Sequence, residues 1–137
     1  MPAIDYVVLA EYVREDGGTV HIMGAGADTF YVASVPTASP AGIAARISFD
    51  STEQVGAEHK FSLIFQDADR HLLEMAGRFL TPPQLPGVPE HWRTAVGLAL
   101  RLVLPLPQLG DYSLELIIDD DPNLAKSIDV RAVLPPQ

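Results

Sequence analysis

The sequence contains no cysteine among its 137 residues. This absence excludes disulfide bonds, thiolate metal sites and cysteine nucleophiles, although it does not fix the cellular compartment. The chain also lacks a run of about 20 apolar residues, the length that a membrane-spanning helix needs. Asp5 and Glu11 interrupt the apolar start of the chain, which is not the pattern of a secretory signal. We therefore expect a cytoplasmic protein.

Positive charge is scarce as well. The 18 acidic residues outnumber the 9 Lys and Arg residues, and the net charge is −9. Phosphate backbones and anionic lipids are bound by clustered cations, so neither nucleic acid nor a membrane surface is an expected partner of this acidic chain. Apolar residues nevertheless make up 47% of the sequence. That share is high for a small domain and favours association with further copies of the chain.

The final third of the chain alternates apolar residues with a period of two. The apolar positions share one face of an extended chain: Val96, Leu98, Leu100, Leu102 and Leu104. This period predicts a strand over residues 96–104 rather than a helix. The segment that follows resembles the tyrosine corner of immunoglobulin-like sandwiches, with Leu106, Gly110 and Tyr112 filling its pattern.

Short segments of alternating or β-branched residues, separated by Gly, Pro and Asp, predict further strands. These segments are residues 4–13, 19–23, 29–35, 43–49, 59–66, 71–80, 112–118 and 127–133. The Asp16-Gly17 turn predicts a hairpin between the first two. Eight or nine strands at this spacing, with no helix, predict an antiparallel, immunoglobulin-like or Greek-key β-sandwich. We expect one domain over residues 1–137, and a closed barrel is the alternative.

Several short motifs are spread over nearly the whole chain. They are Asp5-Tyr6, Tyr12-Val13-Arg14, Gly17-Gly18, Gly24-Ala25-Gly26, Phe65-Gln66-Asp67 and the corner over residues 105–113. In this combination the chain looks like a member of an uncharacterised family of small bacterial proteins, catalogued as a domain of unknown function. The resemblance implies a free-standing domain. It implies no activity, ligand or catalytic residue.

Acidic residues in the predicted turns are candidate metal ligands. Carboxylate and amide oxygens are the ligands that calcium prefers, and residues 119–123 supply several. Counting strand reversals places the loops with Asp28, with Asp50 and Glu53, and with Glu90 and His91 at the same end of the sandwich. The sequence thus offers a calcium-type site built from Asp28, Asp50, Asp119, Asp120, Asp121 and Asn123. The competing interpretation is that Asp and Asn favour turns without any ion, and the glycine of a calcium loop is absent.

Other motifs give less support for chemistry. Gly24-Ala25-Gly26 precedes a strand, which favours a turn over a phosphate-binding loop. The four histidines, His21, His59, His71 and His91, lack metal-site spacing, so we expect each to face solvent or to make a single hydrogen bond. No serine lies in a nucleophile elbow, although a catalytic triad is a spatial arrangement that spacing alone does not reveal.

Candidate interface residues occur in three places. Trp92 and Arg93 follow a proline-rich loop and are residue types common in binding hot spots, although Trp92 could equally cover one end of the core. Ala99, Arg101 and Val103 face away from the core on the predicted strand 96–104, where an apolar face could lie beneath another subunit. Tyr31 lies on the proline-bordered strand 29–35.

The sequence therefore predicts a non-enzymatic binding or assembly module that forms a homo-oligomer through a sheet face or an edge strand. The strands 4–13 and 29–35 are the candidate edges, because exposed edges are templates for pairing. No cofactor is expected. The alternative is a calcium-type binding module or a metal-dependent hydrolase at the acidic end. A small-ligand carrier is disfavoured because bulky apolar residues fill the predicted interior.

Overall fold

The computed structural model describes residues 1–26, 28–89 and 91–136, and within them the chain forms ten strands and no helix. In chain order these are β1 (Pro2–Ala10), β2 (Tyr12–Asp16), β3 (Thr19–Met23), β4 (Thr29–Tyr31), β5 (Thr37–Phe49), β6 (Glu58–Gln66), β7 (His71–Leu80), β8 (Thr94–Leu106), β9 (Gly110–Ile118) and β10 (Ala125–Val133). Over the same residues, no helix has the length and apolarity that crossing a membrane requires.

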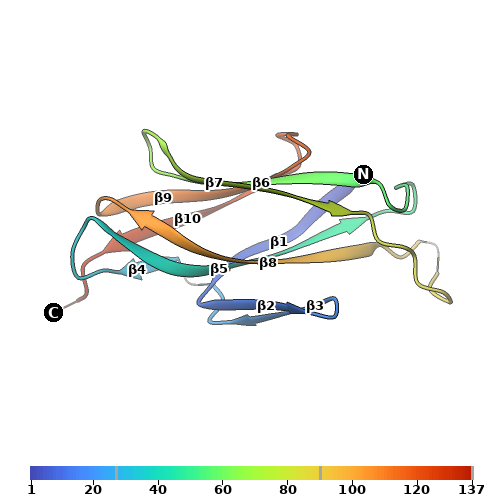
Figure 1. The fold of residues 1–137 in the computed structure, drawn as a ribbon, viewed down its shortest axis with the longest axis horizontal. Coiled ribbons are helices and arrows are strands. Elements are labelled where there is room, and N and C mark those ends of the chain that lie inside the picture. The colour runs from blue at the N-terminus through green and yellow to red at the C-terminus, as the bar shows by residue number, and fades with distance from the viewer. Residues whose placement is uncertain (27, 90, 137) are drawn as a thin grey trace.

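The strands form two sheets that pack on each other and one separate hairpin (Figure 1). One sheet has the order β1-β5-β8, the other has the order β4-β10-β9-β6-β7, and β2 and β3 pair with each other. Every neighbouring pair is antiparallel except β4 and β10, which run parallel. The predicted all-β, antiparallel sandwich is confirmed apart from the parallel pair of β4 and β10, and the finer immunoglobulin-like or Greek-key topology stays a prediction.

Period-two alternation builds the core between the sheets. The inward side chains of β5 and β9 are at most 3% exposed: Ile43, Ala45, Ile47, Phe49, Tyr112, Leu114, Leu116 and Ile118. Burial of a large apolar side chain contributes about 1.5–3 kcal/mol, so this alternation fixes which face of each strand points inward.

The tyrosine corner before β9 forms at the predicted residue. The Tyr112 hydroxyl donates to the carbonyl of Gln108 and accepts a hydrogen bond from the Gln108 backbone N–H at 3.1 Å. These two bonds hold the turn between β8 and β9 in place, and Tyr112 itself is buried beside Phe65, with 5.2 Å between the ring centroids.

The predicted first strand, residues 4–13, is in fact two strands that break at Glu11. β1 pairs with β5, whereas β2 turns away with β3 to form a hairpin against the outer face of the β1-β5-β8 sheet. Val13 is fully buried there against Ala44, which lies on the face of β5 opposite to the inward Ile43 and Ala45. The hairpin can approach because the residues beneath it are small, so the prediction failed where short side chains allow a second layer.

The predicted strand 29–35 is shorter than expected. β4 ends at Tyr31, and a cis peptide bond joins Val35 to Pro36 before β5 begins at Thr37. β4 still lies at a sheet edge, as predicted, but only three of its residues pair with β10. With β1 and β2 as separate strands, the described residues hold ten strands instead of the predicted eight or nine.

Candidate functional site

One end of the sandwich collects polar side chains around His59, the second residue of β6. Its Nδ1 atom lies 2.7 Å from Oδ2 of Asp119, and its Nε2 atom lies 3.0 Å from Oγ1 of Thr81 and 3.6 Å from Oε2 of Glu53. The His59 ring is buried and lies between Phe49 and Phe79, with 5.3 and 5.5 Å between centroids. The expectation of a solvent-facing or singly bonded histidine is wrong for His59.

Asp119 reaches His59 because its backbone adopts a left-handed conformation, with φ of 55°. Its N–H donates to the Lys60 carbonyl at 2.8 Å, and its Oδ1 accepts from the Lys60 N–H at 2.9 Å. Asp and Asn tolerate this conformation better than most residues because their side chains bond local backbone. Asp120 has the same conformation, with φ of 54°, and its carboxylate pairs with the Lys60 ammonium at 3.2 Å.

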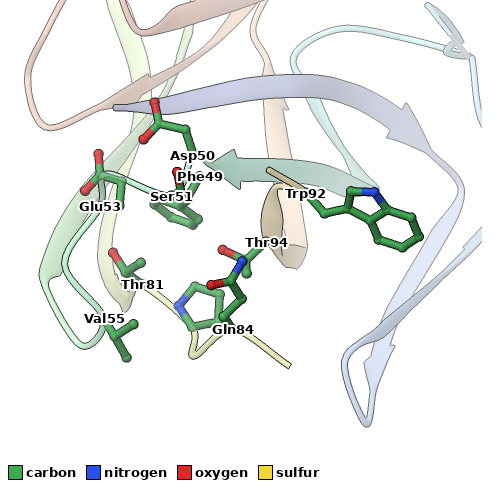
Figure 2. A pocket seen from close by; sticks show the side chains of 10 residues that line it. Phe49, Asp50, Ser51, Glu53, Val55, Thr81, Gln84, Trp92 and Thr94 are labelled. Carbon is green, nitrogen blue, oxygen red and sulfur yellow. The ribbon is translucent and has the colours of Figure 1, made fainter. Parts of the chain in front are cut away.

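A small cleft of about 60 Å³ lies beside this cluster, and Figure 2 shows its lining. Asp50, Glu53 and Thr81 lie on one side, Thr94 and Gln84 lie in the middle, and the indole of Trp92 is on the opposite side. The carboxylates of Asp50 and Glu53 both bind the α-ammonium of Met1, at 3.1 and 2.8 Å. One positive charge of the chain therefore offsets part of the two negative charges.

The Asp50 carboxylate is held in its ionised form by several donors. The hydroxyl of Thr52 is the main cause, and together with the Met1 ammonium and the Thr52 N–H it lowers the pKa of Asp50 from 3.8 to about 2. The Met1 ammonium has a raised pKa, chiefly because it donates to Glu53. Hydrogen bonds to a charged group favour that charged form, which is the cause of both shifts.

Thr81, His59 and Asp119 follow the order of a nucleophile, a base and an orienting carboxylate. Thr81, however, is only 3% exposed. Its backbone N–H already donates to the Ala57 carbonyl at 2.9 Å, so that N–H is not free to stabilise an oxyanion. The arrangement instead joins the starts and ends of β6, β7 and β9 through buried hydrogen bonds.

The six predicted metal ligands do not converge. Asp28 precedes β4, and its carbonyl accepts from the N–H of Arg131 near the end of β10, whereas residues 119–123 precede the start of β10. Six residues of strand separate Arg131 from Ala125, or about 20 Å. The strand count that placed Asp28 at the same end is wrong, because the β2–β3 hairpin leaves the sheet and alters the sequence of reversals.

Asp50 and Asp119 do lie at one end, with Glu53 and His59 between them. Asp121 accepts the N–H of Asn123 at 2.9 Å, as an ordinary turn residue does. In the described ranges, no group of three or more His, Cys, Asp and Glu side chains is placed to hold a metal ion. Glu90 lies outside the residues that the structure describes.

Two predicted interface residues are engaged within the molecule. Ala99 packs beneath the β2–β3 hairpin. The Arg101 guanidinium lies 4.4 Å from the centroid of the Tyr12 ring, and its Nε donates to the Val13 carbonyl at 3.1 Å. The apolar outward face of β8 around Ala99 is therefore covered by this chain's own hairpin.

Three others are exposed, and one turns inward. Val103 is 62%, Tyr31 64% and Trp92 57% exposed. Trp92 also borders an apolar groove of about 410 Å³ under the proline-rich loop. Arg93 points back to the sheet, where its Nε donates to the Ser48 hydroxyl at 2.9 Å. Trp92 lies just before the start of β8 and Val103 near its end, so these two do not share one surface patch.

β7 is the second edge of the five-stranded sheet, and the sequence does not predict this edge. Beside this strand, the Thr81 N–H donates to Ala57 on the β6 side, and on the far side of β6 the Asp119 N–H donates to Lys60. Backbone groups alternate in direction along a strand, so odd residues of β7 point toward β6 and Glu74, Ala76, Arg78 and Leu80 point their N–H and C=O groups away. No other described strand pairs with that side.

A family model described as a family of unknown function, DUF6941, matches residues 5–131. No curated protein and no solved structure matches the chain.

Proposed function

The chain belongs to DUF6941, a family of unknown function, and we propose that it is a non-enzymatic assembly module of the bacterial cytoplasm that binds another β-strand along the free edge of β7. The observation that carries the proposal is that this edge is both long and free of features that prevent pairing. β7 has ten residues, contains no proline and presents a row of unpaired backbone groups. Such an edge is a template for pairing with a further strand.

The other three edges are less suited to pairing. β4 offers three residues. β1 has a register shift between Ile4 and Tyr6, and the Lys126 ammonium donates to the Asp5 carbonyl at 3.3 Å beside that shift. β8 contains Pro105, which has no N–H. Short strands, bulges and prolines are the features that blunt an edge, so β7 replaces the two edges that the sequence suggested.

The alternative of a calcium-type module or metal-dependent hydrolase has no comparable support. Its acidic side chains bind the chain's own donors: the Met1 ammonium, the His59 ring, the Lys60 side chain and the Asn123 N–H. Asp28 lies away from the others.

The proposal is tested by removing one outward N–H from β7. In Ala76→Pro the lost N–H points away from β6, so the β6–β7 ladder keeps its hydrogen bonds. Ala76→Ser, which retains the N–H, is the matched control. We expect wild type and Ala76→Ser to form a discrete oligomer in native mass spectrometry and light scattering, and Ala76→Pro to be a monomer with an unchanged circular dichroism spectrum.

A second variant covers the case in which Ala76→Pro does not fold. Ala76→Lys keeps every backbone donor and introduces a positive charge on the outward face of the edge, a device that natural edge strands use against pairing. A wild-type protein that stays monomeric across the concentration series would overturn the proposal, as would an oligomer that survives both Ala76→Pro and Ala76→Lys.

A further inference from the structure

We infer that the strand bound by β7 is β7 of a second copy of this chain, antiparallel and centred on Ala76. The inference rests on the function proposed above and specifies its partner and register. It follows from the charge pattern along the strand together with the direction of its backbone groups.

The outward residues of β7 form a self-complementary series. Glu74, Ala76 and Arg78 are exposed, lie on the same face of the sheet and direct their N–H and C=O groups to the free edge. A two-fold axis through Ala76 pairs that residue with itself in the second copy. Glu74 of each copy then lies opposite Arg78 of the other, and all three pairs are of the hydrogen-bonded kind.

Neighbouring registers lose this complementarity. A two-fold axis at Arg78 places two guanidinium groups opposite each other, and an axis at Glu74 places two carboxylates opposite each other. Axes at Met75 or Gly77 place each charged residue opposite an uncharged one or beyond the strand. Opposite charges across a strand pair are favourable and like charges are unfavourable, so the Ala76 register is preferred.

The side chains at the axis also fit. Ala76 is small and exposed, so the two Ala76 side chains that meet at the axis leave room for the two strands to pair. In the described part of the chain Glu74 forms no salt bridge, whereas Arg78 pairs with Glu58. A guanidinium has five N–H donors in a planar fork, so Arg78 can keep Glu58 and still bind Glu74 of the second copy.

The other long edge lacks such a pattern. Arg101 is the one charged residue of β8. Pairing of β8 with itself therefore brings only like charge or none to the contact. Moreover, the Arg101 side chain is already directed to Tyr12 and the Val13 carbonyl on the hairpin. Charge complementarity favours β7 as the strand that recognises a second copy.

Charge reversal tests the register. Each single variant, Glu74→Arg or Arg78→Glu, places like charges at both contacts between residue 74 of one copy and residue 78 of the other. We expect each to weaken dimerisation about tenfold or more. The double variant Glu74→Arg/Arg78→Glu should dimerise as wild type does. An equimolar mixture of the two single variants should form a heterodimer, because both contacts between residues 74 and 78 then join opposite charges. Asp129→Arg, on the same sheet but away from this edge, is the control.

The outcomes separate this inference from the proposed function. If Ala76→Pro produces monomers but neither the double variant nor the mixture restores the dimer, strand pairing at β7 stands and the register is overturned. If neither Ala76→Pro nor Ala76→Lys changes the oligomer, both fall. The thermal unfolding temperature of each variant is measured as well, because substitution of Arg78 also removes its ion pair with Glu58. An unchanged temperature shows that a lost dimer does not result from a destabilised fold.

Discussion

His59 and Asp119 are 60 positions apart in the sequence, and Nδ1 of His59 lies 2.7 Å from Oδ2 of Asp119. The opposite ring nitrogen of His59 reaches the hydroxyl of Thr81, which follows β7. One buried ring therefore connects the start of β6 to the segments that follow β7 and β9. A buried polar group of this kind is stabilising only while all of its partners are present.

Removing the His59 ring should be costly. His59→Ala leaves the buried Thr81 hydroxyl without its partner and removes the aromatic contacts with Phe49 and Phe79. We expect a loss of about 2–4 kcal/mol in the free energy of unfolding, measured by urea denaturation. His71→Ala, at an exposed position of β7, should change it by less than about 0.5 kcal/mol. Equal effects of the two substitutions would show that the cluster carries no special stability.

Asp50 predicts a specific dependence of stability on pH. Its pKa in the folded chain is about 2, below the usual 3.8, so its contribution is complete above pH 3.8 and disappears as the pH falls toward 2. The urea midpoints of wild type and Asp50→Asn should therefore converge between pH 5 and 2. Thr52→Ala removes the main cause of the shift and should raise the Asp50 pKa toward 3.8, as followed by carboxyl NMR. A gap between wild type and Asp50→Asn that stays constant down to pH 2 would contradict this.

Gly97 should be essential for seating the hairpin. A Cβ atom added at Gly97 would lie 2.4 Å from Cγ2 of Val20, well inside contact distance. Gly97→Ala should therefore lower the free energy of unfolding by about 1–3 kcal/mol, the usual cost of overpacking. Val20→Ala makes room, so the double variant should be less destabilised than the sum of the single variants. Strict additivity in this double-mutant cycle would argue against the contact.

The hydroxyl of Tyr112 should stabilise the turn before β9 independently of the packing of its ring. Tyr112→Phe keeps the ring beside Phe65 but removes both hydrogen bonds to Gln108. The expected loss is about 1–2 kcal/mol in the free energy of unfolding. Tyr31→Phe, at an exposed residue, is the control and should be close to neutral. A comparable loss in both variants would remove the corner as the explanation.

Ala76 offers a direct probe of the contact between two copies. The chain has no cysteine, so Ala76→Cys introduces the only thiol. Facing residues of a hydrogen-bonded strand pair have Cα atoms about 5.5 Å apart, within the range that a disulfide spans. Mild oxidation should yield a covalent dimer on non-reducing gels, whereas Asp129→Cys should give little. Equal yields for both would indicate random collision.

Much of the fold could be predicted from local patterns. The alternation at Leu100, Leu102 and Leu104 and the corner at Tyr112 depend on neighbours in sequence, and both recur in the structure. The hairpin against β5 could not be predicted, because Val13 reaches Ala44 only through an added layer. That layer requires small residues on a face that looks solvent-exposed in the sequence, and no period in the sequence marks it.

The polar end was harder to predict than the strands. The sequence places Asp50 and Asp119 at one end, where they do lie, but it predicts that His59, which lies between them, faces solvent or makes a single hydrogen bond. His59 lies two residues before Phe61 in β6, so the two side chains share the inward face of that strand. This spacing is the signal that His59 faces inward. The edge character of β7 depends on strand order, which follows from contacts between distant segments and not from the strand's own sequence.

The three-residue length of β4 also limits how large an assembly can grow. Two copies joined at β7 share one continuous sheet whose outer margins are both β4. In each copy the long edge of that sheet, β7, is then paired. The remaining edge of the sheet, β4, is too short to pair with a third copy. Along this sheet the proposed two-fold contact would close at two copies, which distinguishes it from head-to-tail stacking into fibres.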